Sequence, residues 1–253
     1  NPAFTRLALP SSATEEQFST KSGVFADMNG DDKADYVAPS QTGFNILIYP
    51  GDGSGGFSSS PSSSTAVSSP AGSTLTDIKS LVVADMNNDG LRDIGFIADN
   101  STADIANLQS LHVMTASANG TIVDMIIDTF QLPNDRFTKL IAQNTALNGK
   151  VALLLTRNSF ITQNVDAEFP ARAYLGDGQG VFSLVTSLTG TPSVFADFNG
   201  DGLLDVLTYA GGTENAAIFR VNRGIAAGGY SDVGTFTVPS APSLTNVVAY
   251  LSG

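Results

Sequence analysis

The sequence predicts an all-β protein, a β-propeller built from four-stranded antiparallel blades, and three observations support this prediction. Glycine contributes 25 of 253 residues and only 14% of the residues are charged. Such a composition favours short strands and tight turns over helices, whose solvent-facing sides need Glu, Lys and Arg. An acidic nine-residue pattern occurs three times. Its copies define a repeat of about 56 residues, which is long enough for four strands.

The acidic pattern is clearest in DMNNDGLRD, which runs from Asp85 to Asp93. Side-chain oxygens stand at its positions 1, 3, 5 and 9, and Gly90 at position 6 permits the positive φ that folds a loop back on itself. Hard oxygen ligands at this spacing suit Ca²⁺, with the main-chain carbonyl of position 7 as a further ligand. The sequence therefore predicts three calcium sites, formed by Asp27, Asn29, Asp31, Lys33 and Asp35, by Asp85, Asn87, Asp89, Leu91 and Asp93, and by Asp197, Asn199, Asp201, Leu203 and Asp205.

The repetition of this loop favours structural calcium over catalysis. Paired carboxylates can serve as acid and base, but an active site is usually built once, whereas a structural clip recurs in every unit. An EF-hand is excluded because the last acid stands at position 9 rather than 12 and the flanking residues favour strands.

The spacing of the loops predicts a fourth, metal-free copy. Their first aspartates fall at 27, 85 and 197, so the first interval is 58 residues and the second, 112 residues, is twice 56. The missing copy falls at 143–151, after a strand-like Leu140-Ile141-Ala142. Its ligand positions hold other residues: Gln143, Thr145, Leu147 and Val151. We expect this copy to keep its strands without binding a metal.

One repeat reads as strand, acidic loop, strand, longer turn, strand, glycine-rich turn and strand. In the first repeat we expect strands at 23–26, 35–39, 45–49 and 57–60. The glycine-rich turn recurs as PGDGSGGF and LGDGQGVF, each of which ends on the Phe that opens the fourth strand.

These landmarks divide the chain into four blades and two single strands at its ends. We expect one propeller domain, or a segment of a longer array, whose end strands share a blade within one chain or between neighbouring chains. The expected parts are 1–22 (outer strand), 23–79, 80–137, 138–192 (the blade without a metal loop), 193–245 and 246–253 (inner strand).

The segments ADMNGDDKADYV, ADMNNDGLRDIGFI and ADFNGDGLLDVLTY resemble FG-GAP/VCBS repeats, the blades of β-propellers such as those of integrin α-subunits. The resemblance implies that Asp27, Asn29, Asp31, Asp35 and their counterparts hold Ca²⁺ between two strands. One departure is Asp32, which replaces the glycine of position 6 and is tolerable because Asp can adopt the left-handed conformation. The other departure is the copy at 143–151, which lacks the ligand residues altogether.

Charge and composition exclude several classes of function. The net charge is −12 and no basic stripe exists, so nucleic acid is not an expected partner. The chain has no Cys, and no apolar run approaches the length of a membrane span. His112 is the only histidine, which leaves little room for zinc or Ser-His catalysis; we expect it to be an ordinary strand residue.

Several surface features remain open in the sequence. The Ser-rich segment 58–74 is either a polar loop between blades or an O-glycosylated loop. Asn100 and Asn119 begin N-glycosylation sequons. A sugar-binding site would need an aromatic ring; Trp is absent, and the candidate rings are Tyr36, Tyr49, Tyr174, Tyr209 and Tyr230.

The expected function is that of a non-enzymatic, extracellular, calcium-stabilised module that binds a glycan or a protein, in an adhesive or structural role. One alternative is a subunit of a surface fibre, joined to copies of itself through the split terminal blade. Another is a calcium-dependent carbohydrate-active enzyme, although the single His and the few basic residues speak against it.

Overall fold

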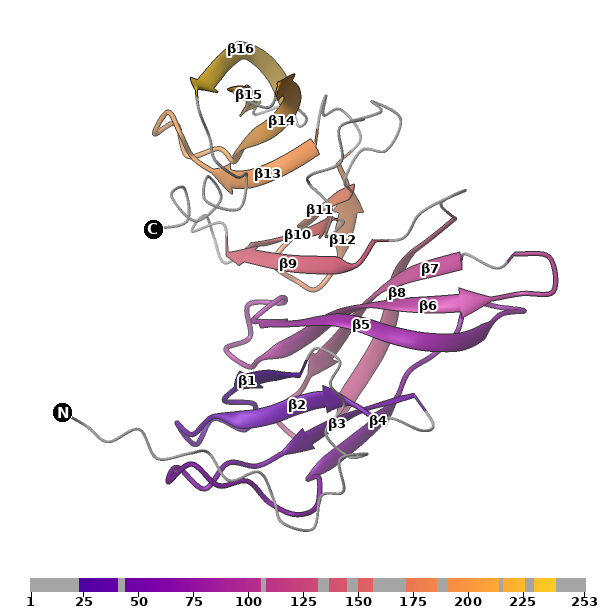
Figure 1. The fold of residues 1–253 in the computed structure, drawn as a ribbon. Helices are drawn as coiled ribbons and strands as arrows, with labels where there is room; N and C mark the ends of the chain where they lie inside the picture. Colours follow the sequence, from indigo (N-terminus) through magenta and orange to yellow (C-terminus); the bar gives the residue numbers. More distant parts are fainter. Residues whose placement is uncertain are drawn as a thin grey trace. The chain divides into compact units, whose positions relative to one another are not determined.

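The computed structural model describes residues 23–40, 44–105, 108–131, 137–144, 150–156, 172–185, 191–213, 216–225 and 230–239. Within these ranges the secondary structure consists of sixteen β-strands, which form four sheets of four strands each (Figure 1). No helix in the described residues is long and apolar enough to cross a bilayer. The predicted all-β fold of four-stranded antiparallel blades is confirmed.

The chain forms two compact units, residues 1–140 and 141–253. In the first unit, one sheet has the order β1-β2-β3-β4 and the other the order β5-β6-β7-β8. The strands of the first sheet are β1 (Val24–Ala26), β2 (Asp35–Pro39), β3 (Asn45–Tyr49) and β4 (Ser63–Ala66). Those of the second are β5 (Thr74–Ala84), β6 (Asp93–Ser101), β7 (Leu108–Ala116) and β8 (Ile122–Gln131).

The second unit contains two further sheets with the same strand order, one of which takes its first residues from the end of the first unit. The strands of one sheet are β9 (Lys139–Asn144), β10 (Val151–Thr156), β11 (Arg172–Gly176) and β12 (Phe182–Leu184). Those of the other are β13 (Thr191–Ala196), β14 (Asp205–Thr213), β15 (Ala216–Gly224) and β16 (Tyr230–Pro239).

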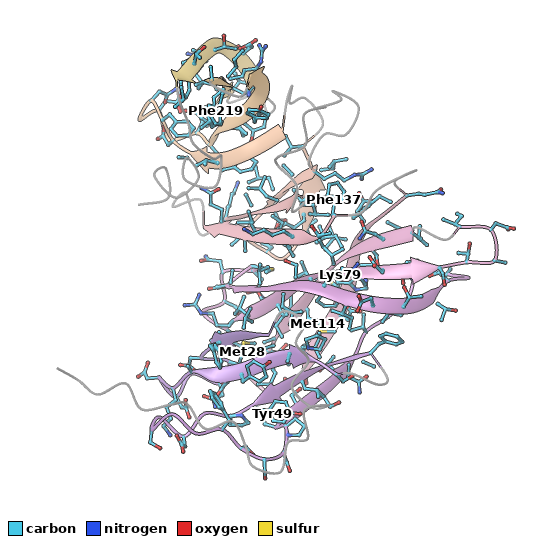
Figure 2. The ribbon with its side chains drawn as sticks, viewed as in Figure 1. Met28, Tyr49, Lys79, Met114, Phe137 and Phe219 are labelled. Atoms are coloured by element: carbon cyan, nitrogen blue, oxygen red, sulfur yellow. The ribbon has the colours of Figure 1, made fainter. Side chains whose placement is uncertain are left out.

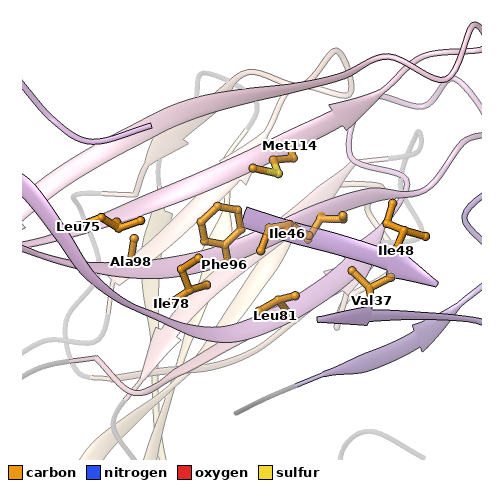
Figure 3. Close-up of a cluster of buried hydrophobic side chains, with 10 residues drawn as sticks. Val37, Ile46, Ile48, Leu75, Ile78, Leu81, Phe96, Ala98 and Met114 are labelled. Atoms are coloured by element: carbon orange, nitrogen blue, oxygen red, sulfur yellow. The ribbon is translucent and has the colours of Figure 1, made fainter. Parts of the chain in front are cut away.

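The core of the first unit lies between its two sheets (Figure 3). Because neighbouring residues of a strand point to opposite faces, Val37 joins this core while Tyr36 and Ala38 belong to a cluster on the other face. The cluster consists of Val37, Ile46, Ile48, Leu75, Ile78, Leu81, Ile94, Phe96, Ala98 and Met114. Full burial of each large apolar side chain contributes about 1.5–3 kcal/mol.

The fourth strand of the first sheet is not where the sequence predicted it. Phe57 makes only an isolated bridge with Gly51, and the strand that pairs with β3 is Ser63–Ala66, inside the Ser-rich segment. That segment is therefore an edge strand with its connections rather than a loop throughout. In addition, β5 begins at Thr74, within the range 23–79 assigned to the first blade. The expected end strands at 1–22 and 246–253 lie outside the described residues.

Candidate metal loops

Each acidic loop joins the first strand of a sheet to the second, namely β1 to β2, β5 to β6 and β13 to β14. The carboxylate of position 1 lies at the centre of the loop and accepts hydrogen bonds from main-chain N–H groups. In the first loop Asp27 Oδ1 accepts from Gly30 N at 2.7 Å and from Asp31 N at 3.2 Å. Asp197 in the third loop repeats both distances with Gly200 and Asp201.

Position 6 closes each loop by donating its N–H to the second oxygen of the position 1 carboxylate. The distances are 2.8 Å for Asp32, 3.0 Å for Gly90 and 2.8 Å for Gly202. All three residues have positive φ, of 62°, 86° and 80°. The expectation that Asp32 can replace glycine by adopting the left-handed conformation is confirmed.

These main-chain donors stabilise the ionised form of the central carboxylate. The N–H of Gly202 is the main cause that lowers the pKa of Asp197, against a smaller opposing effect of desolvation. For Asp27 desolvation is the largest single effect and raises the pKa, but four main-chain N–H groups together lower it below its ordinary value. Each of these two loops thus holds a negative charge at its centre.

Positions 3, 5 and 7 follow one another along the loop through side-chain to main-chain bonds. The Oδ1 atoms of Asn29, Asn87 and Asn199 accept from the N–H of position 5, at 2.9, 3.1 and 2.8 Å. The Oδ1 atoms of position 5 accept in turn from Lys33, Leu91 and Leu203, at 3.0, 2.8 and 2.8 Å. The structure therefore places the residues of positions 1, 3 and 5 along one turn of chain.

Position 9 has a different environment from the other ligand positions. Asp35, Asp93 and Asp205 are buried, with at most 1% of their surface exposed. One oxygen of each accepts from the N–H of position 2 (Met28, Met86, Phe198), at 3.0, 2.8 and 3.0 Å. The other accepts from the N–H of the last residue of the third strand (Ala116, Gly224), at 2.9 Å in both, or of a residue just beyond that strand (Gly51), at 3.0 Å.

The aspartate at position 9, called the ninth aspartate below, thus joins three parts of the blade. Its two hydrogen bonds form a bracket that connects the loop and the third strand to the start of the second strand. The sequence suggested only its role as a ligand, because the bracket depends on where the third strand ends. In the first loop, Met28 at position 2 also packs against the core between the two sheets, where Met114 lies (Figure 2). For Asp93, burial raises the pKa, an effect that its two hydrogen bonds oppose and that the charges of Asp89 and Asp85 add to.

The donor set of the loops fits a hard cation. Every side-chain ligand predicted is a carboxylate or amide oxygen, and a carboxylate oxygen that accepts one N–H retains a lone pair for a metal. Within the described residues, no three His, Cys, Asp or Glu side chains form a ready-made metal cluster. The carboxylates bind main-chain amides instead. The three calcium sites stay a prediction.

The metal-free copy uses its first position in another way. Gln143 stands where the other loops have aspartate, and its Oε1 accepts from Phe195 N at 2.9 Å while its Nε2 donates to Phe195 O. Gln109 makes the same pair of bonds with Phe137, at 2.8 and 3.0 Å. Val151, at position 9, is buried. Thr145 and Leu147 lie outside the described residues.

Replacing Gln143 with leucine is expected to lower the free energy of unfolding by about 1–3 kcal/mol, because it leaves the main chain of Phe195 without its partners. Urea denaturation followed by circular dichroism measures this loss. Gln179, exposed in a glycine-rich turn, provides the control. An equal loss in Gln179→Leu would show that added apolar surface, rather than the lost bonds, is responsible.

A buried Ser-His-Asp relay in the second sheet was not foreseen from the sequence. His112 is fully buried and stacks on Phe96, with ring centroids 4.7 Å apart. Its Nε2 lies 2.8 Å from Ser110 Oγ and its Nδ1 lies 3.0 Å from Asp124 Oδ1. Asp124 also accepts hydrogen bonds from the N–H and hydroxyl of Ser68, in the connection between β4 and β5.

No local pattern reveals this relay, because Asp124 reaches His112 only through the pairing of β7 with β8. Burial is the largest single effect on the pKa of Asp124 and raises it. The hydrogen bond and charge of His112 and the hydrogen bonds from Ser68 together outweigh burial, so the pKa lies below its ordinary value. His112 is a strand residue, as the sequence predicted. Asp124, which it contacts, anchors the β4–β5 connection to β8, the outer strand of the second sheet, through its bonds with Ser68.

The two sequons differ in accessibility. Asn100 is fully buried, and its Nδ2 donates to Ala98 O at 3.2 Å and to Ser110 Oγ at 2.8 Å. A glycan on Asn100 is therefore incompatible with this fold. Asn119 is exposed in the turn between β7 and β8.

The four-stranded antiparallel sheets, three of which open with an acidic strand-loop-strand unit, are typical of the blades of β-propeller-like repeat proteins. Residues 27–96 match the family model of the FG-GAP-like repeat. The match extends from the first acidic loop to β6, beyond the second loop, and confirms the resemblance to FG-GAP repeat proteins. No curated protein matches the chain.

Proposed function

We propose that this protein is a non-enzymatic extracellular module, stabilised by Ca²⁺, that presents its blades to a glycan or a protein ligand. The observation that carries the proposal is the near-identical hydrogen bonding of three acidic loops in three blades. A structural clip repeats in this way, whereas a catalytic centre does not. The FG-GAP-like repeat at 27–96 supports an extracellular module of this kind.

The residues that would hold calcium are those of positions 1, 3 and 5, with the main-chain carbonyl of position 7 and a free lone pair of the position 9 carboxylate. The bound ion would supply a positive charge that offsets the repulsion among the loop carboxylates. The chain contributes the arrangement: the ninth aspartate fixes the loop to the sheet, and the positive φ at position 6 turns the chain around the centre.

The buried relay supports a non-enzymatic function. Ser110, His112 and Asp124 have the connectivity of a hydrolase triad, but Ser110 is fully buried within the second sheet. A substrate has no access to its hydroxyl in this fold. His112 is the only histidine in the sequence, so no other Ser-His pair can form.

Burial of their side chains reduces the number of tyrosines that could stack against a sugar ligand. Tyr36, Tyr49 and Tyr174 are buried in their sheets and present no ring face to solvent. Tyr209 and Tyr230 are half-buried. Burial and the nearby charge of Asp205 raise the pKa of Tyr230 to about 12. These two tyrosines are the ones to replace if a glycan array detects binding.

Calcium is expected to raise the Tm of the protein, because an ion bound only by the native state stabilises that state. A site at about 100 times its Kd gains about 2.7 kcal/mol. Calorimetric unfolding in calcium and in excess EGTA, together with isothermal titration, measures the shift and the number of sites. We expect three sites per chain.

A single loop can be removed to check the count. Asp201→Ala at position 5 of the third loop should leave two sites, whereas Asp177→Ala, in a glycine-rich turn outside the acidic loops, should leave three. An unchanged Tm after complete chelation, with no heat of binding, would overturn the proposal.

A further inference from the structure

Two of the three acidic loops contain an asparagine immediately followed by glycine. Asn29–Gly30 and Asn199–Gly200 occupy positions 3 and 4, where the second loop has Asn87–Asn88. Both asparagines are exposed. Glycine has no side chain to shield its main-chain nitrogen or restrict its backbone. An Asn–Gly bond is therefore open to attack by that nitrogen on the asparagine side chain.

The reaction is deamidation and needs only water. The glycine nitrogen loses its proton to a base and forms a bond to the asparagine Cγ, and the side-chain nitrogen takes up a proton and leaves as ammonia. Water then opens the resulting succinimide at either carbonyl. The products are aspartate and isoaspartate, and isoaspartate adds one methylene to the main chain.

In the closed loop, hydrogen bonds restrain both reacting groups, the glycine nitrogen and the asparagine side chain. The N–H of Gly30 donates to Asp27 Oδ1 and that of Gly200 donates to Asp197 Oδ1, each at 2.7 Å. The side-chain carbonyls of Asn29 and Asn199 are fixed by the N–H of position 5, at 2.9 and 2.8 Å. Attack therefore requires the loop to open, and repulsion among its carboxylates favours opening when no cation is bound.

We propose that Asn29 and Asn199 are deamidation sites that calcium protects by keeping their loops closed. The protection rests on the proposed calcium binding, whereas the modification itself does not. An added methylene between positions 3 and 4 displaces the N–H groups that surround the carboxylate of position 1. Molecules that carry isoaspartate in the first or third loop would therefore lose that site irreversibly after a period without calcium, while the second loop would keep its own.

The chain offers two internal controls. Asn87 occupies the same position in the second loop but precedes Asn88 instead of glycine, and a side chain at this position hinders attack by its main-chain nitrogen. Asn119–Gly120 is an exposed Asn–Gly bond outside the acidic loops, and its glycine N–H donates to Ser117 O at 2.8 Å. Calcium should affect neither control.

The test incubates the full chain at mildly alkaline pH in calcium or in EDTA and follows each asparagine by peptide mapping with mass spectrometry. In EDTA, we expect Asn29 and Asn199 to gain one mass unit and yield isoaspartate, while Asn87 does not. Calcium at about 100 times its Kd lowers the open population roughly 100-fold and should slow both conversions by a similar factor. Asn119 should convert equally in both buffers.

The variant Asn88→Gly extends the test to the second loop. Asn88 has a positive φ of 60°, so glycine fits its conformation without strain. The variant should make Asn87 deamidate in EDTA as Asn29 does. Intact Asn29 and Asn199 in EDTA would overturn the proposal, as would equal rates in both buffers when calorimetry on the same sample detects calcium binding. Absence of binding heat would identify failure of the proposed function separately.

Discussion

Replacing Asp93 with alanine is expected to lower the free energy of unfolding by about 2–5 kcal/mol even without calcium. The side chain is fully buried and accepts hydrogen bonds from Met86 N at 2.8 Å and from Ala116 N at 2.9 Å. Alanine leaves both donors without their acceptor. Urea denaturation in excess EDTA measures the loss, since chelation removes any contribution from calcium.

The matched control is Asp89→Ala in the same loop. Asp89 is exposed, and its carboxylate accepts from the N–H of Leu91 and from the side-chain amide of Asn87, both within the loop. We expect this variant to lose calcium affinity at one site and to keep most of its stability in EDTA. If both variants lost the same stability in EDTA, the ninth aspartate would have no structural role beyond that of any loop carboxylate.

Replacing His112 with alanine is expected to cost about 3–5 kcal/mol, because it leaves the buried carboxylate of Asp124 without its imidazole partner. The side chains of His112 and Asp124 are 0% and 6% exposed. His112→Phe is the control that keeps stacking on Phe96 while losing both hydrogen bonds. It should recover the packing part of the loss but not the electrostatic part.

Two further measurements test the same relay. Ser110 Oγ accepts from Asn100 Nδ2 and has its own proton to donate to His112 Nε2, so for the uncharged imidazole we expect the tautomer with hydrogen on Nδ1. Because the chain has a single histidine, nitrogen NMR can show directly which ring nitrogen of His112 carries the hydrogen. Since the pKa of Asp124 is lowered in the folded state, its stabilisation is present above its ordinary pKa and disappears as pH falls through the folded pKa.

The stability difference between the wild type and Asp124→Asn should therefore shrink in acid. A difference independent of pH, or an uncharged imidazole with its hydrogen on Nε2, would contradict this description of the relay.

The sequence was sufficient where the controlling interactions are local. The acidic loops contain their own turn chemistry, so the second and third strands of the first sheet, Asp35–Pro39 and Asn45–Tyr49, fall where predicted. Asp32 likewise adopts the positive φ that its position requires. Both predictions depend on residues fewer than ten positions apart.

The sequence was insufficient to predict the features that depend on pairing between strands or on contacts between residues far apart in the chain. Ser63–Ala66 has little intrinsic preference for a strand, and it forms β4 because β3 offers a free edge, with Ile48 opposite Ser63. The bond between Ser68 and Asp124 spans 56 residues and that between Gln143 and Phe195 spans 52. No local pattern of hydrophobic or turn residues encodes such contacts.

The bracket at the ninth position also bears on the order in which the blades fold. The hydrogen bonds of Asp35 reach only 7 and 16 residues along the chain, and the longest of its counterparts, from Asp93, reaches 23. Contacts of short sequence separation require little loop-closure entropy and form early. A blade can therefore assemble its first three strands as soon as they are synthesised, because the contacts that join them need neither the later blades nor a bound cation.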